Sequence, residues 1–245
     1  MTTMTITPVR RTTRPVGLAL GSLAGTALLV SGVWNALFQA HVTSSGPPAL
    51  VAGATPEQGM RAYYTWFAGT VAQDRAISIV AMVGVTGLVV LADGVRRRIG
   101  DSDLLGRAAC TAVGAGGLVW ITGALITMGG HRAVGLMATH ANPIDATNSI
   151  AFTINVTADA FNTAAFVLLG LAMVAIGIAP VRTGSPGWSA LSIFIGAVSL
   201  VVAAGYVEGV DSITTYVLGL LAAVLLPVWL VWTGRTLDTE QPLLG

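Results

Sequence analysis

Three histidines are the residues of this chain with the most adaptable chemistry: His41, His131 and His140. Neutral imidazole together with a carboxylate, here Asp145 or Asp159, is the usual ligand set for zinc or iron. Two histidines can also clasp a haem iron, and His41 and His131 are the candidates for that role. The spacing matches none of the patterns HxH, HxxxH or HExxH. Solvated loop residues are therefore the simpler interpretation, and a metal or haem site remains the alternative.

Polar residues also recur at helical spacing inside and beside the apolar segments. Ser31, Asn35 and Gln39 are four residues apart, which places them on one helix face. A second stripe shares one face in the same way and comprises Asn148, Asn155, Asp159 and Asn162. Polar groups that face lipid are costly, so both stripes should face a bundle interior or a wet cavity. The predicted pocket residues are Ser31, Asn35, Gln39, Asn155, Asp159, Asn162, Tyr206 and Glu208.

Several catalytic chemistries are excluded or disfavoured by the residue content. The chain has no lysine, which excludes a Schiff base and a P-loop, and no GxSxG or HExxH motif. Its single cysteine, Cys110, excludes an intrachain disulfide and a CxxC redox pair. Each aspartate and glutamate maps to a segment end or a loop, which disfavours ion-coupled transport. We assign no catalytic residue, and an enzyme is the less favoured class.

Composition defines the class of protein that must position these residues. Of the 245 residues, 54% are hydrophobic and 9% are charged, with a mean hydropathy of +0.78. A soluble domain carries roughly a quarter charged residues, so the chain is predicted to be an integral membrane protein. The lipid bilayer is then its first partner. A net charge of +1 without a basic stripe gives no case for nucleic acid.

Six segments are long and apolar enough to cross a bilayer as α-helices, since about 20 such residues are needed. They are approximately residues 16–40, 76–92, 108–129, 160–179, 188–207 and 213–232. The predicted fold is an all-α bundle of six transmembrane helices over residues 16–235. Residues 1–15 and 236–245 are then short terminal tails.

The arginines predict the orientation of the bundle. With a cytoplasmic N-terminus, nine of them fall inside: Arg10, Arg11, Arg14, Arg96, Arg97, Arg98, Arg107, Arg182 and Arg235. Only Arg61, Arg75 and Arg132 fall outside. Because cytoplasmic loops are enriched in arginine, both termini are predicted to be cytoplasmic, in the cell membrane of a bacterium. All three histidines then lie at the outer face.

Two of the predicted outer connections are long and partly helical, at about residues 41–75 and 130–159. In the first, Thr55 and Gln58 form a capping box with Pro56 at the first helical position. This predicts a short aromatic-rich helix at the outer interface, ahead of the second span. In the second connection, a helix is predicted to begin near Pro143 and to project above the membrane.

The second half of the chain resembles a family of small six-span bacterial membrane proteins of unestablished function. The resemblance covers residues 165–237 and rests on "AFVLLGLAMVAIGIAPVRTGSPGWSALSIFIGAVSLVVAAGYV" and the ending "LLPVWLVWTGRTL". In that family a glycine-centred span leads to a short basic inner turn. A Gly-Trp start then opens the fifth span, and the last span ends in aromatic and basic residues. The resemblance implies six spans and carries no catalytic residues or cofactor.

Gly17, Gly21 and Gly25 form a double GxxxG on the first span. Such a groove lets another helix backbone approach closely, either within the bundle or in a protein partner or second copy. We expect a non-enzymatic multi-pass membrane protein with an outward-facing polar pocket, which binds a small molecule or lipid or serves as an accessory subunit. The alternatives are a metal- or haem-binding enzyme or redox protein, and a small-solute channel or exporter.

Overall fold

The computed structural model describes residues 16–45, 53–99, 103–140, 143–179, 185–210 and 212–239. Within these ranges the fold is all-helical and has no strand. The first five helices are α1 (Val16–Ser45), α2 (Pro56–Arg98), α3 (Leu104–Thr139), α4 (Ile144–Ile178) and α5 (Pro186–Glu208). The last rod is continuous and contains η1 (Ile213–Val217), α6 (Leu218–Leu220), η2 (Leu221–Leu225) and α7 (Leu226–Thr239).

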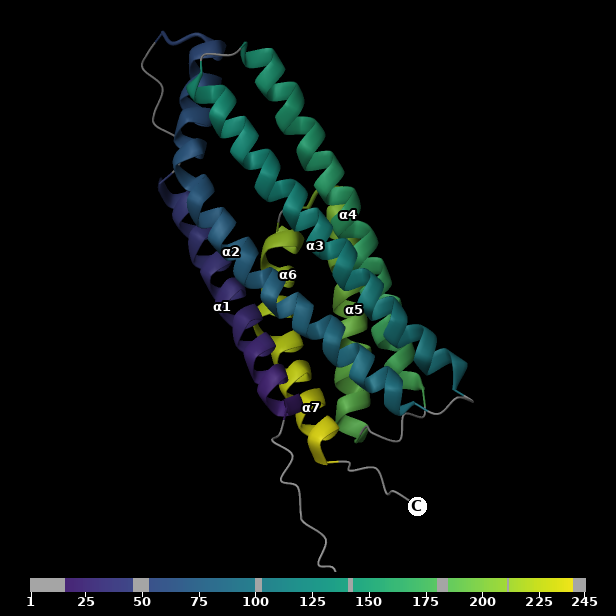
Figure 1. Ribbon diagram of the computed structural model, residues 1–245. Helices are drawn as coiled ribbons and strands as arrows, with labels where there is room; N and C mark the ends of the chain where they lie inside the picture. The colour runs from purple at the N-terminus through teal and green to yellow at the C-terminus, as the bar shows by residue number, and fades with distance from the viewer. Residues whose placement is uncertain are drawn as a thin grey trace, which may run out of the picture.

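Six rods of this fold are long and apolar enough to cross a membrane, which confirms the predicted number of spans. They fit a multi-pass membrane protein. Helices that are neighbours in sequence pack side by side from α1 to α5, and α7 returns to pack against α1. We call the end that holds Pro56, Thr139 and Ile144 the upper end, as in Figure 1. The lower end holds Val16, Arg98 and Thr239.

Three of the helices are much longer than a bilayer requires. α2, α3 and α4 contain 43, 36 and 35 residues. At about 1.5 Å per residue they span roughly 50–65 Å, against a hydrocarbon core of about 30 Å. Their surplus lies together at the upper end, above the tops of α1 and α5 (Figure 1). This region, residues 56–75, 130–139 and 144–158, is called the upper extension.

The upper extension differs from the expected loops because its helices continue into the spans without a break. Thr55 caps α2 as predicted, with its side chain accepting from the Gln58 N–H and the Gln58 side chain accepting from the Thr55 N–H. No proline follows Pro56 before Arg98, so nothing in the sequence interrupts the backbone ladder. The predicted short interfacial helix is therefore the first part of α2, and the helix expected near Pro143 is the first part of α4.

The glycines of α1 bring it into close contact with α7 of the same chain. A Cβ added at Gly21 would lie 2.4 Å from the Leu230 carbonyl oxygen, and one at Gly17 would lie 2.6 Å from that of Gly234. The Asp238 carboxylate caps α1 from the same side. It accepts from the N–H groups of Gly17 at 2.9 Å and Leu18 at 2.6 Å. The GxxxG face is thus occupied within the chain.

The lower half of the bundle contains two buried tryptophans that stack on each other, and each of them donates a hydrogen bond to a hydroxyl group. Trp188 Nε1–H donates to the Thr233 hydroxyl at 2.9 Å, and Trp229 Nε1–H donates to the Ser192 hydroxyl at 2.9 Å. The two indole rings stack with centroids 5.8 Å apart. All four side chains are buried, so both indole N–H groups depend on these acceptors. Trp229 is therefore a core residue of the bundle.

The last rod contains two widened turns. The Leu218 N–H donates to the Ile213 carbonyl, and the Leu226 N–H donates to the Leu221 carbonyl, each five residues back. Pro227 follows the second of these turns and has no N–H to donate, which disturbs the regular i to i−4 ladder. Such π-helical turns are rare and often lie at functional sites.

Candidate ligand site in the upper extension

A histidine–aspartate pair joins α3 to α2 in the upper extension. His131 Nδ1 lies 2.9 Å from Asp74 Oδ2. A carboxylate only accepts hydrogen bonds, so the proton of this contact belongs to Nδ1, and Nε2 is left on the other side of the ring. The side chains of His131 and Asp74 are 21% and 23% exposed, so the pair is sheltered but accessible.

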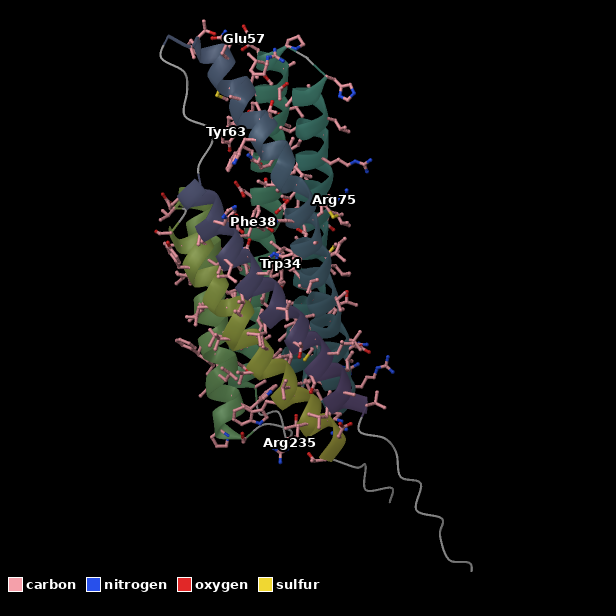
Figure 2. All side chains as sticks on the ribbon, turned by 90° about the vertical axis from the view of Figure 1, so that its left-hand side faces the viewer. Trp34, Phe38, Glu57, Tyr63, Arg75 and Arg235 are labelled. Atoms are coloured by element: carbon pink, nitrogen blue, oxygen red, sulfur yellow. The ribbon has the colours of Figure 1, made fainter. Side chains whose placement is uncertain are left out.

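Aromatic rings of α2 surround this pair. The Phe67 ring meets the His131 imidazole edge-to-face, with centroids 5.0 Å apart. Tyr63 stacks on Phe67 at 6.4 Å and also contacts Trp66 at 5.8 Å. These residues fall one turn apart along α2, so the helix places the rings and Asp74 on one side. In Figure 2, Tyr63 lies above Phe38 of α1, and Arg75 lies on the opposite flank of α2.

A small core separate from the main one holds the three helices of the upper extension together. Tyr64, Val134 and Ala138 are its buried members, and Ile154 is among the partly buried side chains packed on it. The Tyr64 hydroxyl donates to Asn148 Oδ1 at 2.7 Å and so joins α2 to α4. Burial and the neighbouring Tyr63 raise the pKa of Tyr64, which keeps this hydroxyl protonated as a donor. The extension is therefore a packed unit that can hold a site in place.

Two cavities have His131 in their walls. One has a volume of about 190 Å³ and is lined by Phe38, Gln39, Tyr63, Trp66, Phe67, Thr70, Asp74 and His131. We call it the Asp74 cavity. The other, the Asn155 cavity, has about 140 Å³ and is lined by Tyr63, Tyr64, Phe67, His131, Val134, Ala151, Ile154 and Asn155. Tyr63, Phe67 and His131 form walls of both.

The predicted pocket residues do not form one site. Gln39 lines the Asp74 cavity, and Asn155 lines the other one. Ser31 is buried and donates to the Leu28 carbonyl of its own helix at 3.0 Å. Asn35 is half-buried and lines neither cavity.

The remaining predicted residues lie lower, where α4 meets α3 and α5. Asn162 packs on α3, where a Cβ at Gly123 would lie 3.0 Å from its Oδ1. Tyr206 stacks on Phe166 with centroids 6.1 Å apart and interacts electrostatically with the exposed Asp159. Glu208 is exposed at the end of α5. These residues belong to a second polar zone, below the two cavities.

The other two histidines occupy different positions. His140 is exposed at the end of α3, and its Nδ1 lies 2.7 Å from the Leu136 carbonyl oxygen. His41 is exposed near the end of α1. Across the part of the chain that the structure describes, His, Cys, Asp and Glu side chains form no group of three or more that could hold a metal ion. His131 and Asp74, which are in contact, supply two potential ligands.

Sequence reasoning missed Asp74, Tyr63 and Phe67 because it treated the helix after Thr55 as a short interfacial element, separate from the second span. The signal was present: Tyr63, Phe67, Thr70 and Asp74 follow the spacing of one helix face. This spacing predicts a shared face only if the helix that begins at Pro56 continues into the second span.

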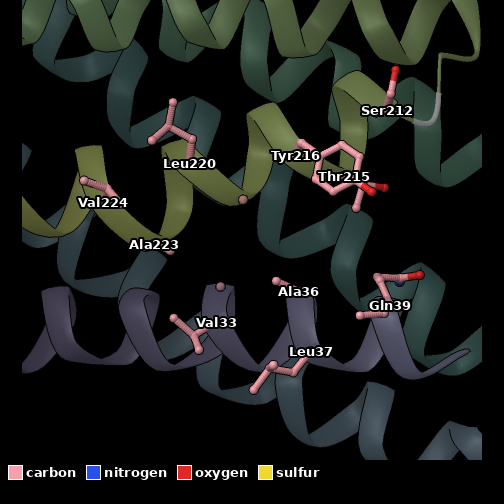
Figure 3. A pocket seen from close by; sticks show the side chains of 13 residues that line it. Val33, Ala36, Leu37, Gln39, Ser212, Thr215, Tyr216, Leu220, Ala223 and Val224 are labelled. Atoms are coloured by element: carbon pink, nitrogen blue, oxygen red, sulfur yellow. The ribbon is translucent and has the colours of Figure 1, made fainter. Parts of the chain in front are cut away.

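A larger groove lies below the Asp74 cavity, between α1 and the last rod. It has a volume of about 820 Å³, and its lining includes Val33, Ala36 and Leu37 of α1 and Leu220 and Ala223 of the last rod, two segments that run side by side in Figure 3. Its walls are mostly apolar, with Gln39, Ser212 and Thr215 toward its upper end. Gln39 thus lines both the groove and the Asp74 cavity.

No protein-family model, curated protein or solved structure matches this chain. The resemblance of residues 165–237 to six-span bacterial proteins stays a prediction.

Proposed function

We propose that this chain is a non-enzymatic protein of the bacterial cell membrane whose upper end faces outward and binds a small molecule. The observation that carries the proposal is the sharing of Tyr63, Phe67 and His131 by two cavities, with Asp74 bonded to His131. Ligand sites are typically concave and mostly apolar, with a few polar groups that orient the ligand. The two cavities have this composition.

The arginines support an outward-facing upper end. Of the eight arginines in the described residues, those at the lower end are Arg96, Arg97, Arg98, Arg107 and Arg235. Those of the upper extension are Arg61, Arg75 and Arg132. Because arginine is enriched on the cytoplasmic side, the lower end is assigned to the cytoplasm and the cavities to the outside.

The chemistry of the walls supports binding without a reaction. A His–Asp pair activates a nucleophile only when a hydroxyl or thiol lies on the free side of the imidazole. The described walls of both cavities contain no serine or cysteine. The Thr70 hydroxyl donates to the Phe67 carbonyl at 2.8 Å. The other hydroxyls on these walls belong to Tyr63 and Tyr64, and that of Tyr64 donates to Asn148.

A thermal-shift screen tests this function. Purified protein in lipid nanodiscs is melted in the presence of small cations, anions and neutral polar molecules. At a concentration one hundred times its Kd, a ligand stabilises the folded state by about 2.7 kcal/mol, which is measurable. We expect at least one compound to raise the melting temperature of the natural protein.

Two histidine variants locate the binding. His131→Ala removes a wall of both cavities and should abolish the shift. His140→Ala is the matched control, because His140 is exposed at the end of the same helix and lines neither cavity. A shift that persists in His131→Ala, or its absence with every compound, would refute the proposal.

A further inference from the structure

The Asp74 cavity combines four aromatic side chains with one carboxylate. Phe38 comes from α1, and Tyr63, Trp66 and Phe67 come from α2. Phe38 is buried, while Tyr63 is 39% exposed and lies above Phe38 in Figure 2. The face of an aromatic ring carries negative electrostatic potential, so converging rings attract a cation.

The charged residues around the cavity also favour a cation. Asp74 is the one acidic side chain on the described walls, and no arginine lines them. Of the upper arginines, Arg61 forms an ion pair with Glu57, with 3.4 Å between Nη2 and Oε1. Arg75 follows Asp74 but projects about 100° away around the helix, on the flank opposite Tyr63 (Figure 2). The described walls therefore carry one acidic side chain and no arginine, a composition that favours a cation.

His131 holds the carboxylate in place. Its Nδ1–H donates to Asp74 Oδ2, so Oδ1 keeps its lone pairs for a second partner. Phe67 packs edge-to-face on the imidazole and limits its rotation. A carboxylate positioned in advance binds a cation with a smaller loss of side-chain entropy. We treat His131 as a positioning residue for Asp74.

We propose that the Asp74 cavity binds a methylated ammonium group, with its charge against the Asp74 carboxylate and its methyl groups against Tyr63, Trp66 and Phe67. This deepens the proposed function, on which it rests, by naming the ligand class. A volume of about 190 Å³ is well below the ~300 Å³ at which drug-sized pockets begin, so the bound group is compact. A metal ion fits these walls less well, since aromatic rings supply no ligand atoms.

Choline is the probe, and its neutral carbon isostere 3,3-dimethylbutan-1-ol is the matched control compound. Both have the same shape, so only the charge distinguishes them. Binding is measured by isothermal titration calorimetry on protein in phosphatidylglycerol nanodiscs, because phosphatidylcholine itself carries the probe group. We expect choline to bind and the isostere to bind at least about fivefold more weakly, as for the loss of one charge contact at about 4 Å in water.

Four variants assign the binding to the cavity. Asp74→Asn keeps an acceptor for His131 but removes the charge, and should weaken choline binding about fivefold or more. Asp74→Glu keeps the charge and should restore part of the affinity. Tyr63→Leu should weaken binding about 2- to 30-fold through the lost ring. Asp145→Asn, which changes an exposed acid of the upper extension that lines neither cavity, is the control and should bind as the natural protein does. Circular dichroism melting checks that each variant is folded.

The outcomes distinguish the ammonium assignment from the proposed small-molecule binding on which it rests. Equal binding of choline and its isostere, or unchanged binding by folded Asp74→Asn, overturns the ammonium assignment. If anions or neutral molecules then still give a shift that His131→Ala abolishes, the proposed function survives without it. If nothing binds at all, both fail. When choline does bind, weaker titration in phosphatidylcholine nanodiscs identifies the lipid headgroup as the source, and equal titration identifies the free solute.

Discussion

Two adjacent glycines of α3 offer a controlled test of how tightly the upper extension is packed. A Cβ added at Gly130 would lie 2.3 Å from Cγ2 of Ile154 on α4, and 2.8 Å and 2.9 Å from its Cδ1 and Cγ1. A Cβ added at Gly129 would meet nothing within 4 Å. The same substitution, glycine to alanine, is thus made at the same depth of the same helix with opposite steric consequences.

The expected free energies follow from two opposing terms. Alanine in a helix interior is more favourable than glycine by about 0.8–1 kcal/mol, and both variants gain this term. Only Gly130→Ala overpacks the α3–α4 contact, which costs about 1–3 kcal/mol. Ile154 cannot move aside freely because it is β-branched and packs in the small core with Tyr64. We expect Gly129→Ala to be neutral or stabilising, and Gly130→Ala to be less stable than it by about 1–3 kcal/mol.

The assay is equilibrium unfolding in mixed micelles with increasing denaturing detergent, followed by helical circular dichroism. The comparison between the two variants cancels the propensity term, so their difference reports the contact alone. If the two variants unfold at the same detergent fraction, then α3 and α4 do not meet at Gly130 as described. The packed nature of the upper extension would then be refuted, together with the positions of the cavity walls.

Three further substitutions test the lower half of the bundle. Asp238→Ala removes the acceptor for two N–H groups at the start of α1 and should lower the unfolding free energy by about 1 kcal/mol, measured by the same detergent titration. Gly21→Ala places a Cβ 2.4 Å from a backbone oxygen and should cost about 1–3 kcal/mol without changing the oligomeric state in size-exclusion chromatography. Ser192→Ala leaves the buried Trp229 N–H without its acceptor and should cost about 1–3 kcal/mol, whereas adding Trp229→Phe should recover part of the loss.

The number of spans was predictable because it depends on a strong local signal. An apolar run of about 20 residues has few other solutions, and the six rods follow from it. The Thr55 capping box was predictable for the same reason, since its partners lie three residues apart. Helix ends were less predictable. The polar residues 56–75 and 144–158 resemble loops by hydropathy, although three packed helices can hold them as regular structure.

The site was only partly predictable because its members come from distant parts of the chain. His131 stood out by its chemistry, and Gln39 and Asn155 by their helical spacing. Asp74 did not, because its role depends on a contact 57 residues away in sequence. Such a pairing is decided by the rotation of α2 and α3 about their axes, which local sequence does not specify. The residues of each predicted polar stripe do lie on helices. The packing of the helices places some of them at the two cavities and the others in the polar zone below.

The contact between Asp238 and the start of α1 can form only at the end of synthesis of the chain. The Gly17 N–H donates to a carboxylate that is synthesised 221 residues later. At a synthesis rate of about 5–20 residues per second, that interval is roughly 10–45 s. During this time the glycine face of α1 has only lipid or other proteins beside it. The last rod then enters between α1 and α5 and covers that face. A newly made chain that stops before residue 226 would therefore present the same glycine face permanently to the membrane.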